Sequence, residues 1–95
     1  MTEKFKNIVI NFIKENWEDT NILYNIEKYT QDSNSLDDIG ADSLDYANFV
    51  MELEKEYDRY FDDDQFVVRE KGFFVRTKTY GEICEYCEII NKTNK

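Results

Sequence analysis

The sequence contains no histidine and no proline, and it has only three glycines and two cysteines. Without histidine, the chain lacks the commonest general base near neutral pH and the commonest zinc ligand. It also cannot build a Ser–His or Cys–His nucleophile from its own residues, so an enzyme is disfavoured. The scarcity of proline and glycine favours helices over a turn-rich β-sandwich. Two cysteines are too few for a disulfide framework.

Long apolar runs are also missing. No stretch approaches the roughly 20 apolar residues of a membrane helix, and residues 1–7 lack the apolar core of a signal peptide. We therefore expect a cytoplasmic protein without a membrane span. The chain does have fifteen aromatic residues in 95, far too many for a disordered acidic tail. Its length fits one domain, residues 1–95.

Negative charge is concentrated in one segment. Residues 36–65 carry a net charge of −9, whereas residues 1–35 carry −2 and residues 66–95 carry +2. Such a field repels nucleic acid and anionic lipid and attracts basic protein surfaces. We expect a monomer that binds protein partners and no nucleic acid, although an acidic segment can also serve only to keep a protein soluble.

Two helices are predicted at the ends of the chain. The first begins after Thr2 as N-cap, and the last begins after Thr79, which precedes Glu82 by three residues as in a capping box. The two cysteines lie on the last helix, where packing is the expected role because zinc needs four ligands. Apolar residues at helical spacing are predicted to face the core: Phe5, Ile8, Val9, Phe12, Ile13 and Trp17 in the first helix, and Ile83, Tyr86, Cys87 and Ile90 in the last.

A third helix is predicted between them, from Asp42 or Ser43 to about Tyr60. It has two apolar faces. The first is predicted to be buried and the second, which acids flank, to be partly exposed. The buried face comprises Tyr46, Phe49, Val50, Leu53 and Tyr57, and the exposed face comprises Leu44, Ala47 and Met51.

The connecting segments are less regular. Between Glu18 and Gly40, a few apolar residues either form a short helical turn or pin a long loop to the core, and residues 30–35 are a loop by composition. Within 62–78, β-branched and aromatic residues flank Gly72, which predicts a small hairpin, with a short helix from Asp62 as the alternative. The apolar residues of the Glu18–Gly40 segment are Ile22, Leu23, Ile26 and Tyr29. In and just after the 62–78 segment, the residues expected to cover one end of the core are Phe66, Val68, Phe74 and Tyr80.

The run Leu36-Asp37-Asp38-Ile39-Gly40-Ala41-Asp42-Ser43-Leu44-Asp45, followed by an acidic helix, resembles the acyl carrier protein family. The likeness covers about residues 36–58. In that family the serine of this motif carries 4′-phosphopantetheine, so the resemblance implies attachment at Ser43, with Asp42 and Leu44 beside it. It further implies a four-helix bundle whose core opens to accept an acyl chain. The segment 62–78 departs from the family pattern and puts the third helix in doubt.

Physical reasoning supports Ser43 as an attachment point. A helix N-terminus favours a phosphodiester through its free N–H groups and dipole. Gly40 and Ala41 leave room for an enzyme to approach. The alternative is that Ser43 is only an N-cap.

The resemblance also implies partners, namely a phosphopantetheinyl transferase and acyl-transferring or condensing enzymes with basic docking surfaces. The acids would meet Arg and Lys on these enzymes and set the encounter rate, while the exposed apolar residues make the central contact. Asn48 stands where family members often have an acid, so some of these partners would bind weakly. The implied partner-binding residues are Asp42, Leu44, Asp45, Ala47, Met51, Glu52 and Glu54.

The sequence therefore predicts a mostly α, acyl-carrier-like helical bundle with a short β-hairpin in place of or beside the third helix. It would hold acyl groups as thioesters for fatty-acid, polyketide or related biosynthesis, and it would be a carrier and not a catalyst. No metal site is expected, because the aspartates around Asp58–Asp64 lack the glycine and glutamate spacing of a calcium loop. An aminoacyl or peptidyl carrier and an unmodified acidic protein-binding module are the alternatives.

Overall fold

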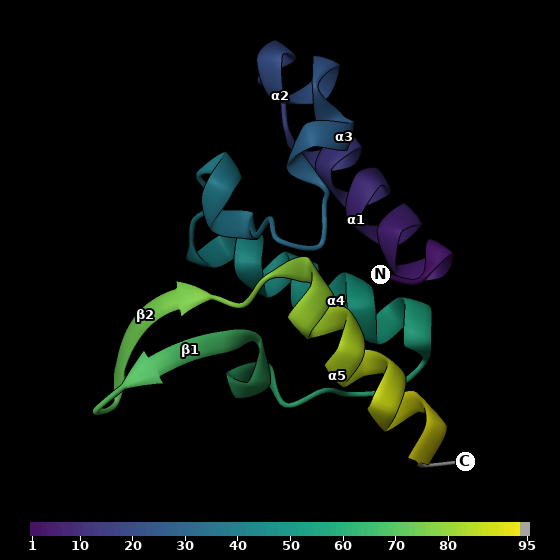
Figure 1. Cartoon of the computed structure of the whole chain (residues 1–95), viewed down its shortest axis with the longest axis vertical. Helices are drawn as coiled ribbons and strands as arrows, with labels where there is room; N and C mark the ends of the chain where they lie inside the picture. The colour runs from purple at the N-terminus through teal and green to yellow at the C-terminus, as the bar shows by residue number, and fades with distance from the viewer. Residues whose placement is uncertain (94–95) are drawn as a thin grey trace.

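The computed structural model describes residues 1–93. Three helices form the body of the protein, and a two-stranded hairpin projects to one side of them (Figure 1). This mostly helical architecture with a short hairpin is the predicted one. In chain order the elements are α1 (Glu3–Asn16), α2 (Thr20–Tyr24), α3 (Ile26–Tyr29), the 3₁₀ helix η1 (Leu36–Ile39), α4 (Ser43–Tyr57), the 3₁₀ helix η2 (Asp63–Phe66), β1 (Val67–Glu70), β2 (Phe73–Thr77) and α5 (Tyr80–Thr93).

The caps of the outer helices are those the sequence predicts. The Thr2 hydroxyl accepts a hydrogen bond from the Phe5 N–H at 3.1 Å at the start of α1. Before α5, the Thr79 hydroxyl accepts from the Glu82 N–H at 3.2 Å and the Glu82 carboxylate accepts from the Thr79 N–H at 3.0 Å. The hydrogen bond from the Thr79 N–H stabilises the charged form of the Glu82 carboxylate and lowers the pKa of that group.

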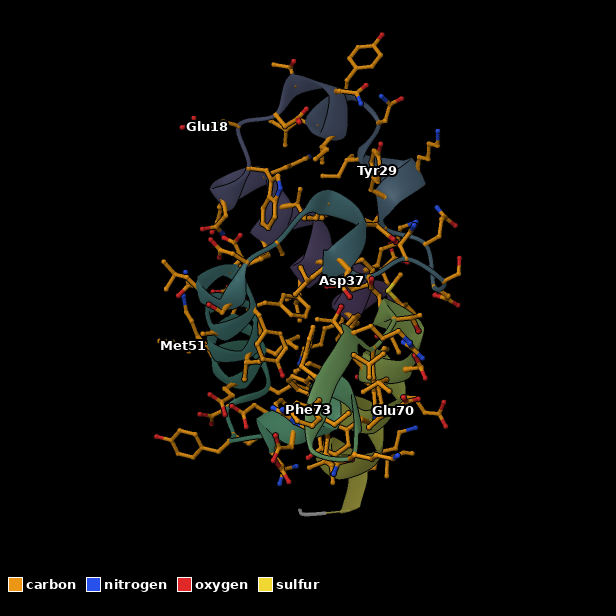
Figure 2. All side chains as sticks on the ribbon, turned by 90° about the vertical axis from the view of Figure 1, so that its left-hand side faces the viewer. Glu18, Tyr29, Asp37, Met51, Glu70 and Phe73 are labelled. Atoms are coloured by element: carbon orange, nitrogen blue, oxygen red, sulfur yellow. The ribbon has the colours of Figure 1, made fainter. Side chains whose placement is uncertain are left out.

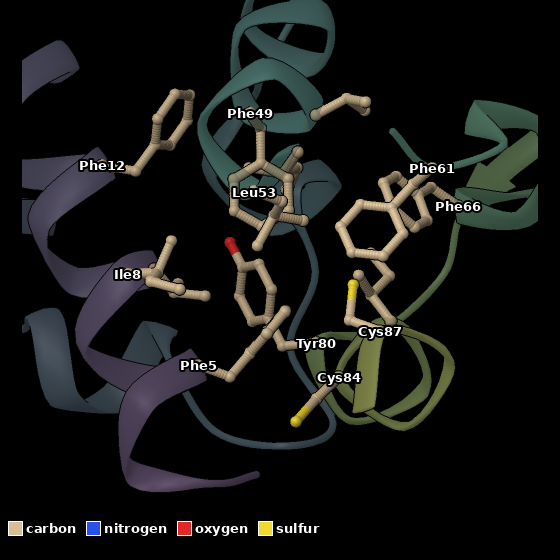
Figure 3. Close-up of a cluster of buried hydrophobic side chains, with 14 of the residues drawn as sticks. Phe5, Ile8, Phe12, Phe49, Leu53, Phe61, Phe66, Tyr80, Cys84 and Cys87 are labelled. Atoms are coloured by element: carbon tan, nitrogen blue, oxygen red, sulfur yellow. The ribbon is translucent and has the colours of Figure 1, made fainter. Parts of the chain in front are cut away.

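The core is an aromatic cluster between α1, α4 and α5. The Phe49 ring of α4 has no exposed surface and lies 6.5 Å from the Phe5 ring, 5.2 Å from the Phe12 ring and 6.2 Å from the Tyr80 ring, centre to centre. Figure 3 shows these rings pointing toward one another from three helices. Such edge-to-face and tilted contacts fill the interior. The residues predicted for the core face of α1 are all buried except Trp17, which is half-buried.

Helix α4 ends three residues earlier than predicted. Asp58 adopts a left-handed conformation with φ of 53°, and the Arg59 N–H then bonds to the Glu54 carbonyl at 3.0 Å. This is the backbone geometry of a helix C-terminus. The Glu54 carboxylate also accepts from the Phe61 N–H at 2.9 Å. These hydrogen bonds end the helix before Tyr60. The spacing of apolar residues does not predict them, so it could not predict this earlier end of α4.

The connection between α1 and α4 is ordered. It contains two short helices, α2 and α3, and then a loop over residues 30–35, as the composition predicts. The 3₁₀ helix η1 follows this loop and was not predicted. The four apolar residues assigned to this region are half-buried and pack on the core: Ile22, Leu23, Ile26 and Tyr29.

The predicted hairpin is present, and η2 precedes it at the aspartate run. Its turn places Lys71 and Gly72 at φ of 52° and 82°, a conformation that glycine adopts without strain. The strands pair antiparallel, with Val67 opposite Thr77 and Glu70 opposite Phe73, and the register shifts after Val68. Between α4 and α5 the described chain thus has η2 and the hairpin where a four-helix bundle would have its third long helix.

One core prediction is wrong. Phe66 and Tyr80 are fully buried and Val68 is half-buried, but the Phe74 side chain is 54% exposed. The strands extend beyond the helices, so only the base of the hairpin, at Val67 and Thr77, is covered. The register shift also interrupts the alternation of side chains from which burial was inferred.

In the part of the chain that the structure describes, the longest helix is α4, with 15 residues. A bilayer-spanning helix needs about 20 apolar residues. Within residues 1–93, no helix has both the length and the apolar character to cross a membrane.

Candidate functional site

The candidate site is Ser43, the first residue of α4. Its side chain is exposed, and among the described residues its hydroxyl has no hydrogen-bond partner. The N-cap is the preceding residue. The Asp42 carboxylate accepts from the Asp45 N–H at 2.8 Å, and the Asp45 carboxylate accepts from the Asp42 N–H at 3.1 Å. Because this pair caps the helix without the serine, Ser43 is not the N-cap of α4.

We expect Asp42→Ala to lower the free energy of unfolding by about 1 kcal/mol, because it removes the acceptor of the N-cap. Ser43→Ala should change it by less than about 0.5 kcal/mol, because an exposed hydroxyl without a partner is lost. Urea unfolding of both variants and the wild type measures the difference. Equal losses in the two variants would show that the serine does help to cap α4.

The loop that precedes Ser43 is held in place by buried residues of η1 and by a hydrogen bond from Trp17. Leu36 and Ile39 of η1 are buried, and the Trp17 indole N–H donates to the Ile39 carbonyl at 3.1 Å. Gly40 then ends η1 with φ of 73°, where a side chain would be strained. A Cβ at this position would meet no atom within 4 Å. The predicted room for an approaching protein is therefore present at Gly40, and the glycine is required there for its backbone conformation.

The start of α4 combines a positive helix end with negative side chains. The N–H groups of Ser43 and Leu44 lie in the first turn, where a helix offers them no acceptor and its dipole favours an anion. The Asp42 and Asp45 carboxylates flank them and already occupy this field. A free phosphate would be repelled by these two acids, whereas a phosphate bonded to Ser43 Oγ needs no electrostatic capture. The site therefore suits covalent attachment better than reversible anion binding.

The second apolar face of α4 is exposed, as predicted. Leu44 is 67% and Met51 64% exposed, and Ala47 between them is exposed as well. Figure 2 shows Met51 at the outer side of α4, away from the core. Exposed apolar side chains in a row on one helix are typical of a contact surface. We call Leu44, Ala47 and Met51 the apolar strip.

The acids assigned to partner binding differ in their surroundings. Asp42 is exposed, whereas Asp45, Glu52 and Glu54 are half-buried. Asp45 and Glu54 each hold a structural hydrogen bond, Asp45 in the cap and Glu54 with the Phe61 N–H. Among the described residues, Glu52 has no hydrogen bond or ion pair. Its partner-binding role can therefore be tested without disturbing the fold.

A groove of about 290 Å³ lies directly beside Ser43. It runs between η1, the first turn of α4 and the base of the hairpin. Its wall is mostly apolar, and Arg69 contributes a cation that also pairs with Asp64 at 3.4 Å. The apolar wall comprises Leu36, Ala41, Tyr46, Val67 and Phe74.

Sequence reasoning did not find this groove. Tyr46 was assigned to the core, yet it is half-buried; its hydroxyl donates to the Asp63 carbonyl, and burial followed by the Asp63 charge raises its pKa to about 12. The Thr77 N–H donates to the Asp37 carboxylate at 2.9 Å and ties the hairpin to η1. No local pattern indicates such a bond between residues so far apart in the chain.

The two cysteines are buried and unpaired. Burial raises the pKa of the Cys87 thiol to about 12, so it stays protonated near neutral pH. Figure 3 shows Cys87 beside the rings of Phe61 and Phe66. The predicted packing role is confirmed for both residues.

Comparison with known proteins identifies the class to which this fold and site belong. No protein-family profile matches the chain, and no solved structure matches it. Curated acyl carrier proteins from three strains of Clostridium perfringens are each 37% identical to it over 62 residues, which are 65% of this chain and 71% of the relative. The chain belongs to the acyl carrier protein family.

Proposed function

We propose that this protein carries acyl groups as thioesters on a 4′-phosphopantetheine arm attached to Ser43 Oγ. The observation that carries the proposal is the free, exposed hydroxyl at the first turn of α4, which another residue caps. Family membership and the unbroken motif around this serine support it. The chain would be a carrier, and the chemistry would belong to its partner enzymes.

Attachment would proceed by transfer from coenzyme A. Ser43 Oγ would form a bond to the phosphorus that bears the pantetheine, the adenosine bisphosphate would leave, and a base of the transferase would take the serine proton. The open space above Gly40 and the exposure of Ser43 allow a second protein to reach this oxygen. The terminal thiol of the arm would then accept an acyl group.

Incubation with coenzyme A and a phosphopantetheinyl transferase should increase the intact mass by one phosphopantetheine group. Ser43→Ala should abolish the increase while keeping the helical circular dichroism of the wild type. Ser33→Ala, which removes an exposed loop hydroxyl, is the matched control and should be modified like the wild type. Modification that persists in Ser43→Ala would contradict attachment at this residue. A wild type that no transferase modifies would favour the unmodified binding module.

The number of reactive thiols provides a second measurement of the attachment reaction. Both cysteines are buried, and the pKa of Cys87 is raised to about 12. The folded, unmodified protein should therefore react slowly with a thiol reagent at neutral pH. The modified protein should show one fast thiol, that of the arm, and the denatured modified protein should show three.

We further propose that partners dock on the start and outer face of α4. The apolar strip would form the centre of the contact, and Asp42, Asp45 and Glu52 would meet basic side chains around it. Charges at the rim of an interface mainly set the association rate, and the desolvated centre sets the lifetime. The concentration of negative charge in residues 36–65 supports a basic partner.

Glu52→Lys should reduce the association rate with the transferase, and rising salt should reduce the wild-type rate, because exposed charges are screened over about 10 Å at 0.1 M salt. Glu85→Lys makes the same charge change at an exposed residue of α5, away from α4, and is the control. Asp45 is unsuitable for this test because its reversal also breaks the cap. Stopped-flow binding that is insensitive to salt and to Glu52→Lys would show that these acids only keep the protein soluble.

A further inference from the structure

The hairpin carries a run of exposed residues outside the helical body. Residues 69–76, which we call the hairpin tip, are all exposed, and Figure 1 shows the strands projecting to one side of the helices. Three successive residues of the tip are apolar: Phe73, Phe74 and Val75 are 77%, 54% and 49% exposed. A contiguous apolar patch on the surface marks a contact with a partner or with a membrane.

The apolar residues of the tip lie on both faces of the hairpin. Successive residues of a strand point to opposite faces, and Phe73 and Phe74 stand opposite Glu70 and Arg69 beyond the register shift. Phe74 lines the groove beside Ser43, whereas Phe73 does not. A flat protein surface that covers one of these rings would leave the other in water. A bilayer surface surrounds an inserted tip and covers both rings.

The hairpin is opposite in charge to the segment that precedes it. Residues 36–65 carry −9 and are repelled by an anionic surface, whereas residues 67–78 carry +3. Anionic lipids attract Lys and Arg close to the bilayer surface, and these long side chains reach the phosphates while their stems lie along apolar groups. The charged residues of the hairpin are Arg69, Lys71, Arg76 and Lys78 against Glu70.

The attachment of the hairpin to the acidic body lies away from its turn. The strands are held at their base, where Thr77 binds Asp37, and the turn is at Lys71. Four steps along a strand from Val67 to this turn span about 13 Å at about 3.3 Å per residue. Charges are screened over about 10 Å at 0.1 M salt. The carboxylates at the base therefore weaken the attraction of a surface at the turn only in part.

Two cations of the hairpin form ion pairs with the body. Arg69 lies 3.4 Å from Asp64, and Arg76 lies 3.5 Å from Glu82. All four side chains are about half exposed or more, and exposed pairs of this kind contribute little to stability. A lipid phosphate can therefore replace either carboxylate at small cost.

We propose that the hairpin tip inserts into the headgroup region of a bilayer that contains anionic lipid. Phe73, Phe74 and Val75 enter this region, and Lys71 with the two arginines binds lipid phosphates. Insertion is shallow, on the order of 5–10 Å, because the two-stranded sheet has open edges whose backbone groups need polar partners.

This contact would hold the candidate attachment site close to the lipid. Ser43 and Phe74 line the same groove, so a tip in the headgroup region keeps Ser43 near the bilayer surface. An acyl group carried there would be presented to an acceptor at the membrane. The contact itself does not rest on the function proposed above, because it needs no arm on Ser43.

Co-sedimentation of the unmodified protein with vesicles tests the proposal. One set of vesicles contains equal parts of phosphatidylglycerol and phosphatidylcholine, and the other contains phosphatidylcholine alone. Binding to the first set should be about tenfold tighter or more, and rising salt should weaken it. Failure to bind the phosphatidylglycerol vesicles would overturn the proposal and favour a protein pocket as the site that receives the tip. Equal binding to both sets would contradict the role of the cations.

Matched variants locate the contact. Phe73→Ser should weaken binding about tenfold, because its ring no longer leaves water on insertion. Its control is Tyr24→Ser, which removes a 91% exposed ring from α2. Lys71→Glu should also weaken binding about tenfold or more, and Lys28→Glu on α3 makes the same change at another exposed lysine. Equal effects of a variant and its control would overturn the assignment to the hairpin.

Phe73→Trp gives a measurement that does not depend on a weakened hairpin. On vesicle binding its emission should shift to shorter wavelength, because the indole leaves water. The wild type, whose single tryptophan is the half-buried Trp17, provides the baseline. Sedimentation of Phe73→Trp with the vesicles without an emission shift would place the contact elsewhere on the protein. Attachment at Ser43 is measured separately by intact mass, so either proposal can fail without the other.

Discussion

Phe49→Ala should remove most of the stability of this protein. The ring lies where α1, α4 and α5 meet, with no exposed surface and three aromatic neighbours. Deleting a buried phenylalanine ring typically costs about 3–5 kcal/mol, because both the transfer free energy and the contacts around the resulting cavity are lost. Small domains have only about 5–15 kcal/mol in total. Urea unfolding should show a much lower midpoint, or a variant already partly unfolded in water.

Phe74→Ala is the control for this effect. The same atoms are removed from a side chain that is 54% exposed and belongs to the hairpin, so the expected loss is below about 1 kcal/mol. The comparison also tests the corrected burial of Phe74. Similar losses in the two variants would mean that the hairpin packs far more tightly than its exposure indicates.

The protein should lose stability steeply in alkali. Burial raises the pKa of Tyr80 and of Cys87, and burial together with a hydrogen bond to Glu88 raises the pKa of Tyr57. The ordinary values are 9.0 for cysteine and 10.0 for tyrosine. When the pH exceeds these pKa values, the cysteine and tyrosine side chains of the unfolded chain lose protons that the buried groups of the folded chain keep. Stability is therefore fully present below about pH 9 and falls as the pH rises toward the folded pKa values.

Tyr80 and Cys87 have no exposed surface, and each should subtract up to about 1.4 kcal/mol per pH unit once its unfolded form ionises. Urea midpoints measured between pH 7 and pH 11 provide the test. Tyr80→Phe should weaken the pH dependence and leave the stability at pH 7 unchanged or higher, because the Tyr80 hydroxyl is buried without a partner among residues 1–93. A midpoint that stays constant up to pH 11 would contradict the assignment of these groups as buried acids.

The sequence predicted the elements that local physics determines. The spacing of Phe5 to Ile13 predicts the buried face of α1, and Thr79 with Glu82 predicts the start of α5, because both depend on neighbours within one or two turns. The hairpin also follows from local chemistry around Gly72. Its position over the first turn of α4 does not, because it depends on a bond between Asp37 and Thr77, 40 residues apart.

The difference between local and long-range interactions also explains which parts of the candidate site could be predicted from the sequence. The motif around Ser43 is continuous in the chain and could be recognised from the sequence. The groove joins Leu36, Ser43 and Phe74 from three separate elements. The sequence did not predict the groove, because Phe74 was expected in the core and therefore not expected to line a groove with Ser43.

The attachment of the hairpin also determines how the protein should fold and open. Its base is held by the Asp37 bond to Thr77 and by η2, where the Tyr46 hydroxyl binds Asp63, while its tip contacts solvent. Closing a 40-residue loop is entropically costly compared with forming helices, so the hairpin should settle last in folding. In the folded protein it should open as a unit, with amides of residues 67–77 exchanging with solvent before those of α1 and α4. A molecule bound in the groove beside Ser43 would contact both strands of the hairpin, so binding there should slow this exchange.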